Sequence, residues 1–102
     1  MELKIAPLSV NKIFQGRRFK TKEYNAWIEE GLWLLKGQTL RQPPYKISIE
    51  FYMSKASDID NPVKGTLDLL KKAGIISDDR YIEYLEIKKI VSKDKKIIIN
   101  FL

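Results

Sequence analysis

The stretch from Tyr45 to Met53 constrains the fold of this chain more than any other part of its sequence. Apolar and polar side chains alternate along it, directly after the pair Pro43-Pro44, which interrupts the preceding segment. A period of two residues places successive side chains on opposite faces of a β-strand. The pattern therefore predicts a half-buried strand, and such a strand needs other elements to cover its apolar face.

A helix is expected soon after this strand. Asn61 stands at the predicted N-cap, Pro62 at the first helical position, and Gly74 just past the last turn. These residue types are favoured at those positions. The side chains expected to face the core are Val63, Leu67, Leu70 and Ala73. Together, the two elements favour a layer of helix packed against a sheet.

The rest of the chain divides into shorter elements. We expect a strand over residues 3–8, an ordered basic loop over 9–20, and an amphipathic helix over 21–36 that ends near Gly37. Two further strands, 81–91 and 96–102, flank a turn at 92–95 and predict a hairpin. Residues 1–102 would thus form a single domain of the α/β (α+β) class, with a mixed sheet of about four strands packed against two helices.

Two amino-acid types are absent, which restricts the chemistry of any site. Without cysteine the chain has no disulfide, thiolate metal ligand or cysteine nucleophile. Without histidine it lacks the commonest general base and the nitrogen ligands that zinc usually takes. Catalysis would have to rest on carboxylates, lysines, tyrosines or a bound metal. Lys and Arg outnumber Asp and Glu by 19 to 13, a net charge of +6, which favours a polyanion such as nucleic acid as partner.

Charged residues gather before the predicted helix and in its first turn. Asp58 and Asp60 are two residues apart in an extended segment, so both side chains can project to one side. Lys64 lies in the first helical turn, where its charge opposes the helix dipole at a cost of about 0.3–1 kcal/mol if exposed. A nearby anion, from the protein or from a substrate phosphate, would compensate that charge. Carboxylates and a lysine are the groups of a magnesium-dependent phosphodiester hydrolase.

The distance between Asp79 and these residues decides whether they can share a site. A helix over 62–73 is about 18 Å long, and the five residues 74–78 can span at most about 16–18 Å. Asp79 can therefore reach Asp58 and Asp60 only if the chain runs back nearly straight. Otherwise Asp79 lies near the far end of the helix, or completes a site across a dimer. A purely structural alternative also remains, because acids before and after a helix are commonly caps and solvated turns.

The spacing of these residues resembles the signature of RusA-type Holliday-junction resolvases. The matching positions are Asp58-Ile59-Asp60-Asn61, Lys64, Leu67-Asp68, Leu70, Ala73-Gly74-Ile75 and Asp78-Asp79. Nearer the amino terminus, Pro7-Leu8-Ser9-Val10-Asn11 followed by Gly16-Arg17 is similar to the Pro/Ser/Asn loop of that family, so the likeness covers most of the chain. One segment departs from the family: Ser54-Lys55-Ala56-Ser57 stands where a familiar member has a run of arginines.

The resemblance implies a RusA-like fold and a homodimeric endonuclease that cuts four-way DNA junctions with paired, symmetric nicks. It also implies Mg²⁺ as the cofactor, with Mn²⁺ as a substitute ion. Carried over position by position, the metal-binding and catalytic carboxylates are Asp58, Asp60 and Asp79, the catalytic lysine is Lys64, and the residues that either support those ligands or act as caps are Asn61 and Asp78.

The basic loop and its neighbours are the expected contacts to DNA. The predicted DNA-binding residues are Asn11, Lys12, Arg17, Arg18, Lys20, Lys22 and Lys55. The cations would hold phosphates, while Phe14 and Phe19 would pack at the centre of the junction; a merely solvated basic surface is the alternative. Tyr24, Trp27 and Trp33 are expected in the core or in a dimer interface rather than stacked on bases.

Other functions stay open at this point. A non-catalytic DNA-binding module of the same fold would bind junctions with strong salt dependence and without metal, and a nuclease of similar chemistry could act on RNA or flap structures. No apolar run is long enough to span a bilayer, and the amino-terminal residues lack the apolar core of a signal peptide. We therefore expect a cytoplasmic protein, encoded by a bacterium or a phage, with no membrane partner.

Overall fold

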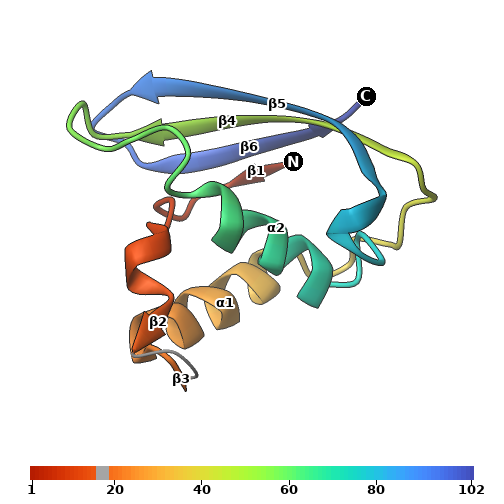
Figure 1. Cartoon of the computed structure of the whole chain (residues 1–102), viewed down its shortest axis with the longest axis horizontal. Coiled ribbons are helices and arrows are strands. Elements are labelled where there is room, and N and C mark those ends of the chain that lie inside the picture. Colours follow the sequence, from red (N-terminus) through yellow and green to blue (C-terminus); the bar gives the residue numbers. More distant parts are fainter. Residues whose placement is uncertain (16–18) are drawn as a thin grey trace.

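Four strands form one mixed sheet in the computed structural model, which describes residues 1–15 and 19–102 (Figure 1). The strands lie in the order β1 (Glu2–Leu3), β6 (Lys96–Phe101), β4 (Tyr45–Met53) and β5 (Ile82–Val91). Strand β4 is antiparallel to β6 and parallel to β5. Helices α1 (Lys22–Leu34) and α2 (Val63–Lys72) both lie below the sheet in Figure 1. The predicted fold class, a mixed sheet packed against two helices, is confirmed.

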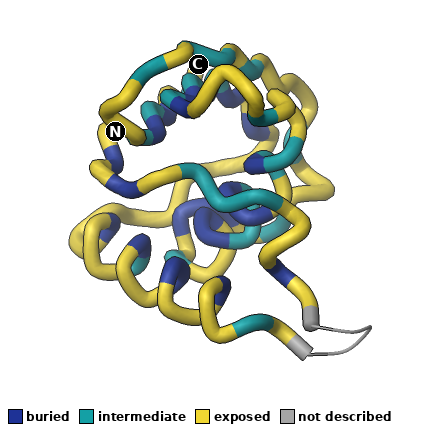
Figure 2. Tube along the Cα trace, turned by 90° about the vertical axis from the view of Figure 1, so that its left-hand side faces the viewer, coloured by how far each residue is buried: buried dark blue, intermediate teal, exposed yellow. Residues whose placement is uncertain are grey.

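Strand β4 is at the centre of the hydrophobic core. Its inward-facing side chains are at most 5% exposed, namely Tyr45, Ile47, Ile49, Phe51 and Met53. The side chains of its other face are exposed or half-buried, so both the bounds and the period predicted for this strand are confirmed. Figure 2 shows that buried positions also recur along the helices. Full burial of one large apolar side chain is worth about 1.5–3 kcal/mol, which makes this face of the sheet the main stabilising surface.

Helix α1 begins at a side-chain cap and packs closely against α2. The Thr21 hydroxyl oxygen accepts a hydrogen bond of 3.0 Å from the backbone N–H of Tyr24, which satisfies one of the free donors of the first turn. Gly31 lies so close to Leu69 that a β-carbon at Gly31 would be 2.5 Å from a Leu69 methyl carbon. The helix ends slightly earlier than predicted, and Gly37 follows it with a φ of +93°.

Helix α2 confirms the predicted C-terminus and corrects the predicted N-terminus. Gly74 has a φ of +73° just past the last turn, the conformation that favours glycine there. The N-cap residue is Pro62, which makes no side-chain cap bond, and the carbonyl of Asn61 instead accepts a hydrogen bond of 2.8 Å from the N–H of Val10. The buried residues are Gly65, Thr66, Leu69 and Leu70, whereas the predicted Val63, Leu67 and Ala73 are only partly buried. The buried stripe is displaced because α2 packs on α1 as well as on the sheet.

Two predictions about strands are wrong. The first strand, expected over 3–8, has only the two residues of β1, because the carbonyl of Ala6 turns to accept a hydrogen bond of 2.7 Å from the indole N–H of Trp27. The last two strands do not form a hairpin, since β4 lies between β5 and β6. The N–H of Ser92 donates to the carbonyl of Met53 at 3.1 Å, so the link 92–95 passes the end of β4. In this central position, both edges of β4 are hydrogen-bonded to neighbouring strands. Strand β4 is also the strand with the most complete apolar alternation.

Short elements occupy the segment that was expected to be a basic loop. It contains the helical turn η1 (Val10–Lys12) and an antiparallel ribbon of β2 (Phe14–Gln15) and β3 (Phe19–Lys20). A second helical turn, η2 (Asp79–Tyr81), directly precedes β5. Among the helices described, none is long and apolar enough to cross a membrane.

Candidate active site

Asp58 and Asp60 lie in the turn that leads into α2. Their backbone carbonyls accept hydrogen bonds of 3.2 Å from the N–H groups of Asn61 and Val63, respectively. Both residues are exposed. Within residues 1–15 and 19–102, no hydrogen bond or ion pair engages either carboxylate. The turn thus fixes the backbone and leaves both carboxylates available to an external cation.

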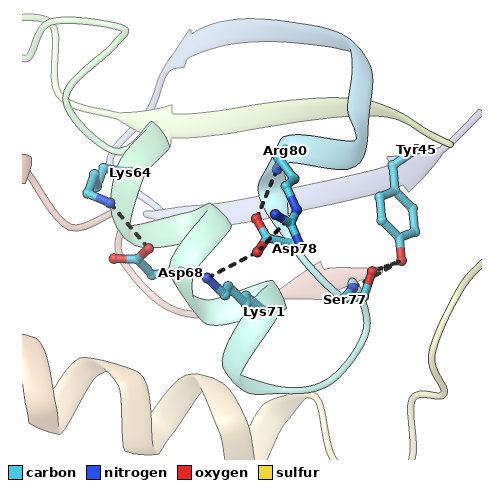
Figure 3. Close-up of polar contacts among 7 residues, drawn as sticks. All are labelled: Tyr45, Lys64, Asp68, Lys71, Ser77, Asp78 and Arg80. Carbon is cyan, nitrogen blue, oxygen red and sulfur yellow. Dashed lines mark hydrogen bonds and ion pairs between the residues drawn. The ribbon is translucent and has the colours of Figure 1, made fainter. Parts of the chain in front are cut away.

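Lys64 finds its compensating anion one turn further along α2. Its ammonium lies 3.5 Å from the carboxylate of Asp68 (Figure 3), and the Tyr24 hydroxyl donates a hydrogen bond of 3.4 Å to the other oxygen of that carboxylate. Burial, followed by the charge of Asp68 and this hydrogen bond, raises the pKa of Tyr24 to about 12. Asp68 was not among the predicted site residues, although its position four residues after Lys64 on one helix face signals the pair.

Four lysines surround Asp68 in an open hollow between the β3–α1 region and α2. The hollow has a volume of about 430 Å³ and is lined by Lys20, Tyr24, Lys64, Asp68, Lys71 and Lys72. The ammonium of Lys20 lies over the rings of Phe14 and Tyr24, 4.3 and 4.6 Å from their centroids. The excess of positive charge suits a phosphate chain. The hollow joins a predicted DNA-binding residue, Lys20, to the predicted catalytic Lys64, and adds Lys71 and Lys72, which sequence reasoning missed.

Asp78 and Asp79 lie at the opposite end of α2. The carboxylate of Asp78 is 3.8 Å from the Lys71 ammonium and 3.8 Å from the Arg80 guanidinium (Figure 3). It also accepts a hydrogen bond of 3.1 Å from the Arg80 backbone N–H. This backbone bond, then a hydrogen bond with Asp79 and the charges of Lys71 and Arg80, hold the pKa of Asp78 below its ordinary value. Asp79 itself is exposed, in the turn η2.

The chain after α2 does not run back along the helix. Ile75 and Ile76 are buried, at 0% and 1% exposure, and the N–H of Ser77 donates to the Tyr45 hydroxyl at 3.0 Å. The segment is therefore anchored beside the C-terminus of α2 and the start of β4. Helix α2, which rises about 1.5 Å per residue, separates Asp60 at its start from Asp79 beyond its end. Within one chain, Asp79 therefore lies near the far end of the helix, and the nearly straight return is not observed.

The three predicted carboxylate ligands do not meet within one copy of the chain. Among the residues described, no group of three or more Asp or Glu side chains is close enough to hold a metal ion. Asp58 and Asp60 lie in the turn before α2, whereas Asp79 lies beside Asp78 past the other end of that helix. The donor chemistry suits Mg²⁺, because hard carboxylate oxygens are the ligands it prefers. The geometry of one chain, however, supplies only part of such a site.

The other predicted site residues are distributed around this region. Asn61 lines a second hollow of about 310 Å³ together with Pro62, Ser54, Ser57 and Lys95. Asn11 and Lys12 lie in η1, and the Lys12 ammonium is 3.6 Å from the carboxylate of Glu23. Lys22 and Lys55 are exposed at the start of α1 and in the loop after β4. Arg17 and Arg18 lie outside the described residues.

The aromatic residues of α1 divide between core and surface. Tyr24 and Trp27 are buried, at 2% and 7% exposure, as predicted. Trp33 is 71% exposed and carries the Lys36 ammonium 4.9 Å from its ring centroid. The core therefore accounts for two of the three. For Trp33 the predicted alternative, a place in a dimer interface, stays a prediction.

Comparison with known proteins identifies the class to which this fold and these charged residues belong. Residues 9–101 match the family model described as Endodeoxyribonuclease RusA. The chain is 29% identical over 89 residues to the crossover junction endodeoxyribonuclease RusA of Aquifex aeolicus (strain VF5), which covers 82% of this chain and 71% of the relative. The chain therefore belongs to the RusA endodeoxyribonuclease family, a family of nucleases.

Proposed function

We propose that this chain is a structure-selective endonuclease that resolves four-way (Holliday) junctions by paired, symmetric nicks. The observation that carries the proposal is the family match over residues 9–101, which spans both halves of the candidate site. The Aquifex relative is named a crossover junction endodeoxyribonuclease, and this supports a junction as the substrate. Such an enzyme would act in the cytoplasm of a bacterium, on cellular or phage DNA.

Asp58, Asp60 and Asp79 are the proposed metal ligands, because carboxylate oxygens suit Mg²⁺ and Mn²⁺. Since Asp79 lies beyond the far end of α2 from the other two, we propose that each site combines Asp58 and Asp60 of one subunit with Asp79 of a second copy in a homodimer. A bound Mg²⁺ would generate a hydroxide nucleophile and neutralise charge on the phosphate. Asn61 and Asp78 flank these ligands and would hold them in position.

Lys64 would bind the scissile phosphate or the leaving oxygen. Its pair with Asp68 is exposed on the lysine side, where 51% of the side chain is accessible, and exposed pairs are weak. A phosphate oxygen can therefore replace Asp68 as its partner at small cost. The lysines of the adjacent hollow, Lys20, Lys71 and Lys72, would hold the DNA backbone around it. A two-fold dimer matches a junction with two equivalent strands to cut.

Cleavage of a synthetic four-way junction in Mg²⁺, beside a linear duplex of the same sequence, tests the proposal. We expect the junction to be cut at symmetric positions in two strands and the duplex to stay intact. Asp60→Asn should lower the cleavage rate at least about 100-fold through loss of a metal ligand, while junction affinity persists because the cations that hold phosphate remain. Glu30→Gln is the matched control, since it removes an exposed carboxylate on α1, away from the candidate site.

Three outcomes would contradict parts of this proposal. Absence of junction cleavage over a range of divalent ions and flanking sequences, with metal-independent and salt-sensitive binding, would instead identify a non-catalytic DNA-binding module. Preferential cutting of RNA or flap substrates would change the substrate class. If Asp60→Asn loses binding and folding together, as judged by circular dichroism, the role of Asp60 is structural.

A further inference from the structure

The outer edge of β5 has no partner strand among the residues described (Figure 1). This strand has 10 residues, whereas β1 at the opposite edge has 2. None of its residues is fully buried, and Tyr84, Leu85 and Val91 are 47%, 38% and 60% exposed. An edge strand of this length presents a row of backbone N–H and C=O groups that can pair with another strand.

We propose that β5 pairs in antiparallel orientation with β5 of a second copy of the chain, so that two sheets join into one. The inference rests on the homodimer of the proposed function and identifies its interface. Self-pairing requires a two-fold axis perpendicular to the sheet. One residue of β5 then lies opposite its own copy, and residues at equal distances on either side of it face each other.

Charge distinguishes among the registers centred near the middle of β5. With Glu86 or Lys88 on the axis, like charges would stand directly opposite each other, which is unfavourable. With Ile87 on the axis, Glu86 faces the partner's Lys88, and Lys88 faces the partner's Glu86. The carboxylate of Glu86 is already oriented on that face, because the hydroxyls of Ser48 and Tyr84 donate to it at 3.2 and 2.9 Å. Of the three registers centred on residues 86, 87 and 88, the one with Ile87 on the axis is therefore the one in which opposite charges face each other.

The same pairing brings the two separated halves of the candidate site together. The strand begins directly after Asp79 and the rest of η2. Its other end lies beside the loop that precedes Asp58, since the Lys89 ammonium donates to the carbonyls of Lys55 and Ser57. In an antiparallel pair the start of one strand lies beside the end of the other. Asp79 of each subunit would thus lie near the Asp58 turn of its partner, with both α2 helices on the same face of the joined sheet.

Sedimentation of charge-exchanged variants, without DNA or metal, tests this interface. Glu86→Lys and Lys88→Glu should each raise the dimer dissociation constant by about tenfold or more. In either homodimer, residue 86 of each chain would face a like charge at residue 88 of the other, which makes two repulsive pairs. An equimolar mixture of the two variants should form a heterodimer with every charge matched, and the double variant should regain the homodimer. Glu29→Lys on the exposed surface of α1 makes the same charge change away from β5 and should sediment as the wild type does.

Each result decides for or against the interface. A monomeric wild type, single variants that dimerise as tightly as the wild type, or a mixture that stays monomeric would overturn it. Circular dichroism of the single variants separates loss of dimer from loss of fold, and recovery in the mixture shows directly that each variant folds. Since the assay uses no substrate, a β5 dimer that fails to cut junctions would contradict the proposed function and leave this inference intact.

Discussion

At the scale of the residue, Asp68 is the link between α1 and the proposed catalytic lysine. It accepts a hydrogen bond from Tyr24 and pairs with Lys64. Because the folded-state pKa of Tyr24 is about 12, against an unfolded value of about 10, neutral Tyr24 adds stability below about pH 10 that is lost as the pH rises towards 12. Asp68→Asn should lower this pKa towards 10, measured by tyrosinate absorbance against a Tyr24→Phe blank. An unchanged Tyr24 titration would show that burial alone sets it.

At the scale of the element, the contact between α1 and α2 depends on two glycines in opposite ways. A β-carbon at Gly31 would lie 2.5 and 2.7 Å from the buried methyl groups of Leu69, whereas one at Gly65 would meet nothing nearer than 3.7 Å. Gly31→Ala should therefore destabilise the fold by about 1–3 kcal/mol. Gly65→Ala should stabilise it by about 0.5–1 kcal/mol, because alanine favours the helix. Urea unfolding midpoints measure both, and equal effects of the two changes would contradict the packing.

At the scale of the whole molecule, the position of the acids predicts complementation between subunits. Asp60→Asn and Asp79→Asn should each be inactive alone, because each removes one ligand from both sites of its dimer. In a mixture, a heterodimer keeps one intact site, with Asp60 from one subunit and Asp79 from the other. An equimolar exchange should recover about a quarter of the wild-type sites, detected as single nicks in a junction with separately labelled strands. A mixture as inactive as its components would place the whole site within one chain.

Local pattern was sufficient for several elements of this fold. The alternation from Tyr45 to Met53 predicted β4 with its bounds, and Gly74 marked the end of α2, because period and end signals are properties of neighbouring residues. The N-terminus of α2 was less well predicted, since Asn61 uses its backbone carbonyl to hold Val10 instead of capping the helix. Asp68 was not predicted as the partner of Lys64, because a spacing of four residues on a helix permits such a pair without deciding between it and the acids that precede the helix.

Residue type and spacing were enough to predict the fold class, the set of carboxylates and lysines, and the family resemblance. Which strands are neighbours, and where Asp79 lies, depends instead on packing between segments that are distant in the chain. The order of strands depends on how apolar faces are shared across the whole sheet, which placed β4 between β5 and β6. Burial of Ile75 and Ile76 holds the chain beside the end of α2, and this non-local packing separates Asp79 from Asp58 and Asp60 in one copy of the protein.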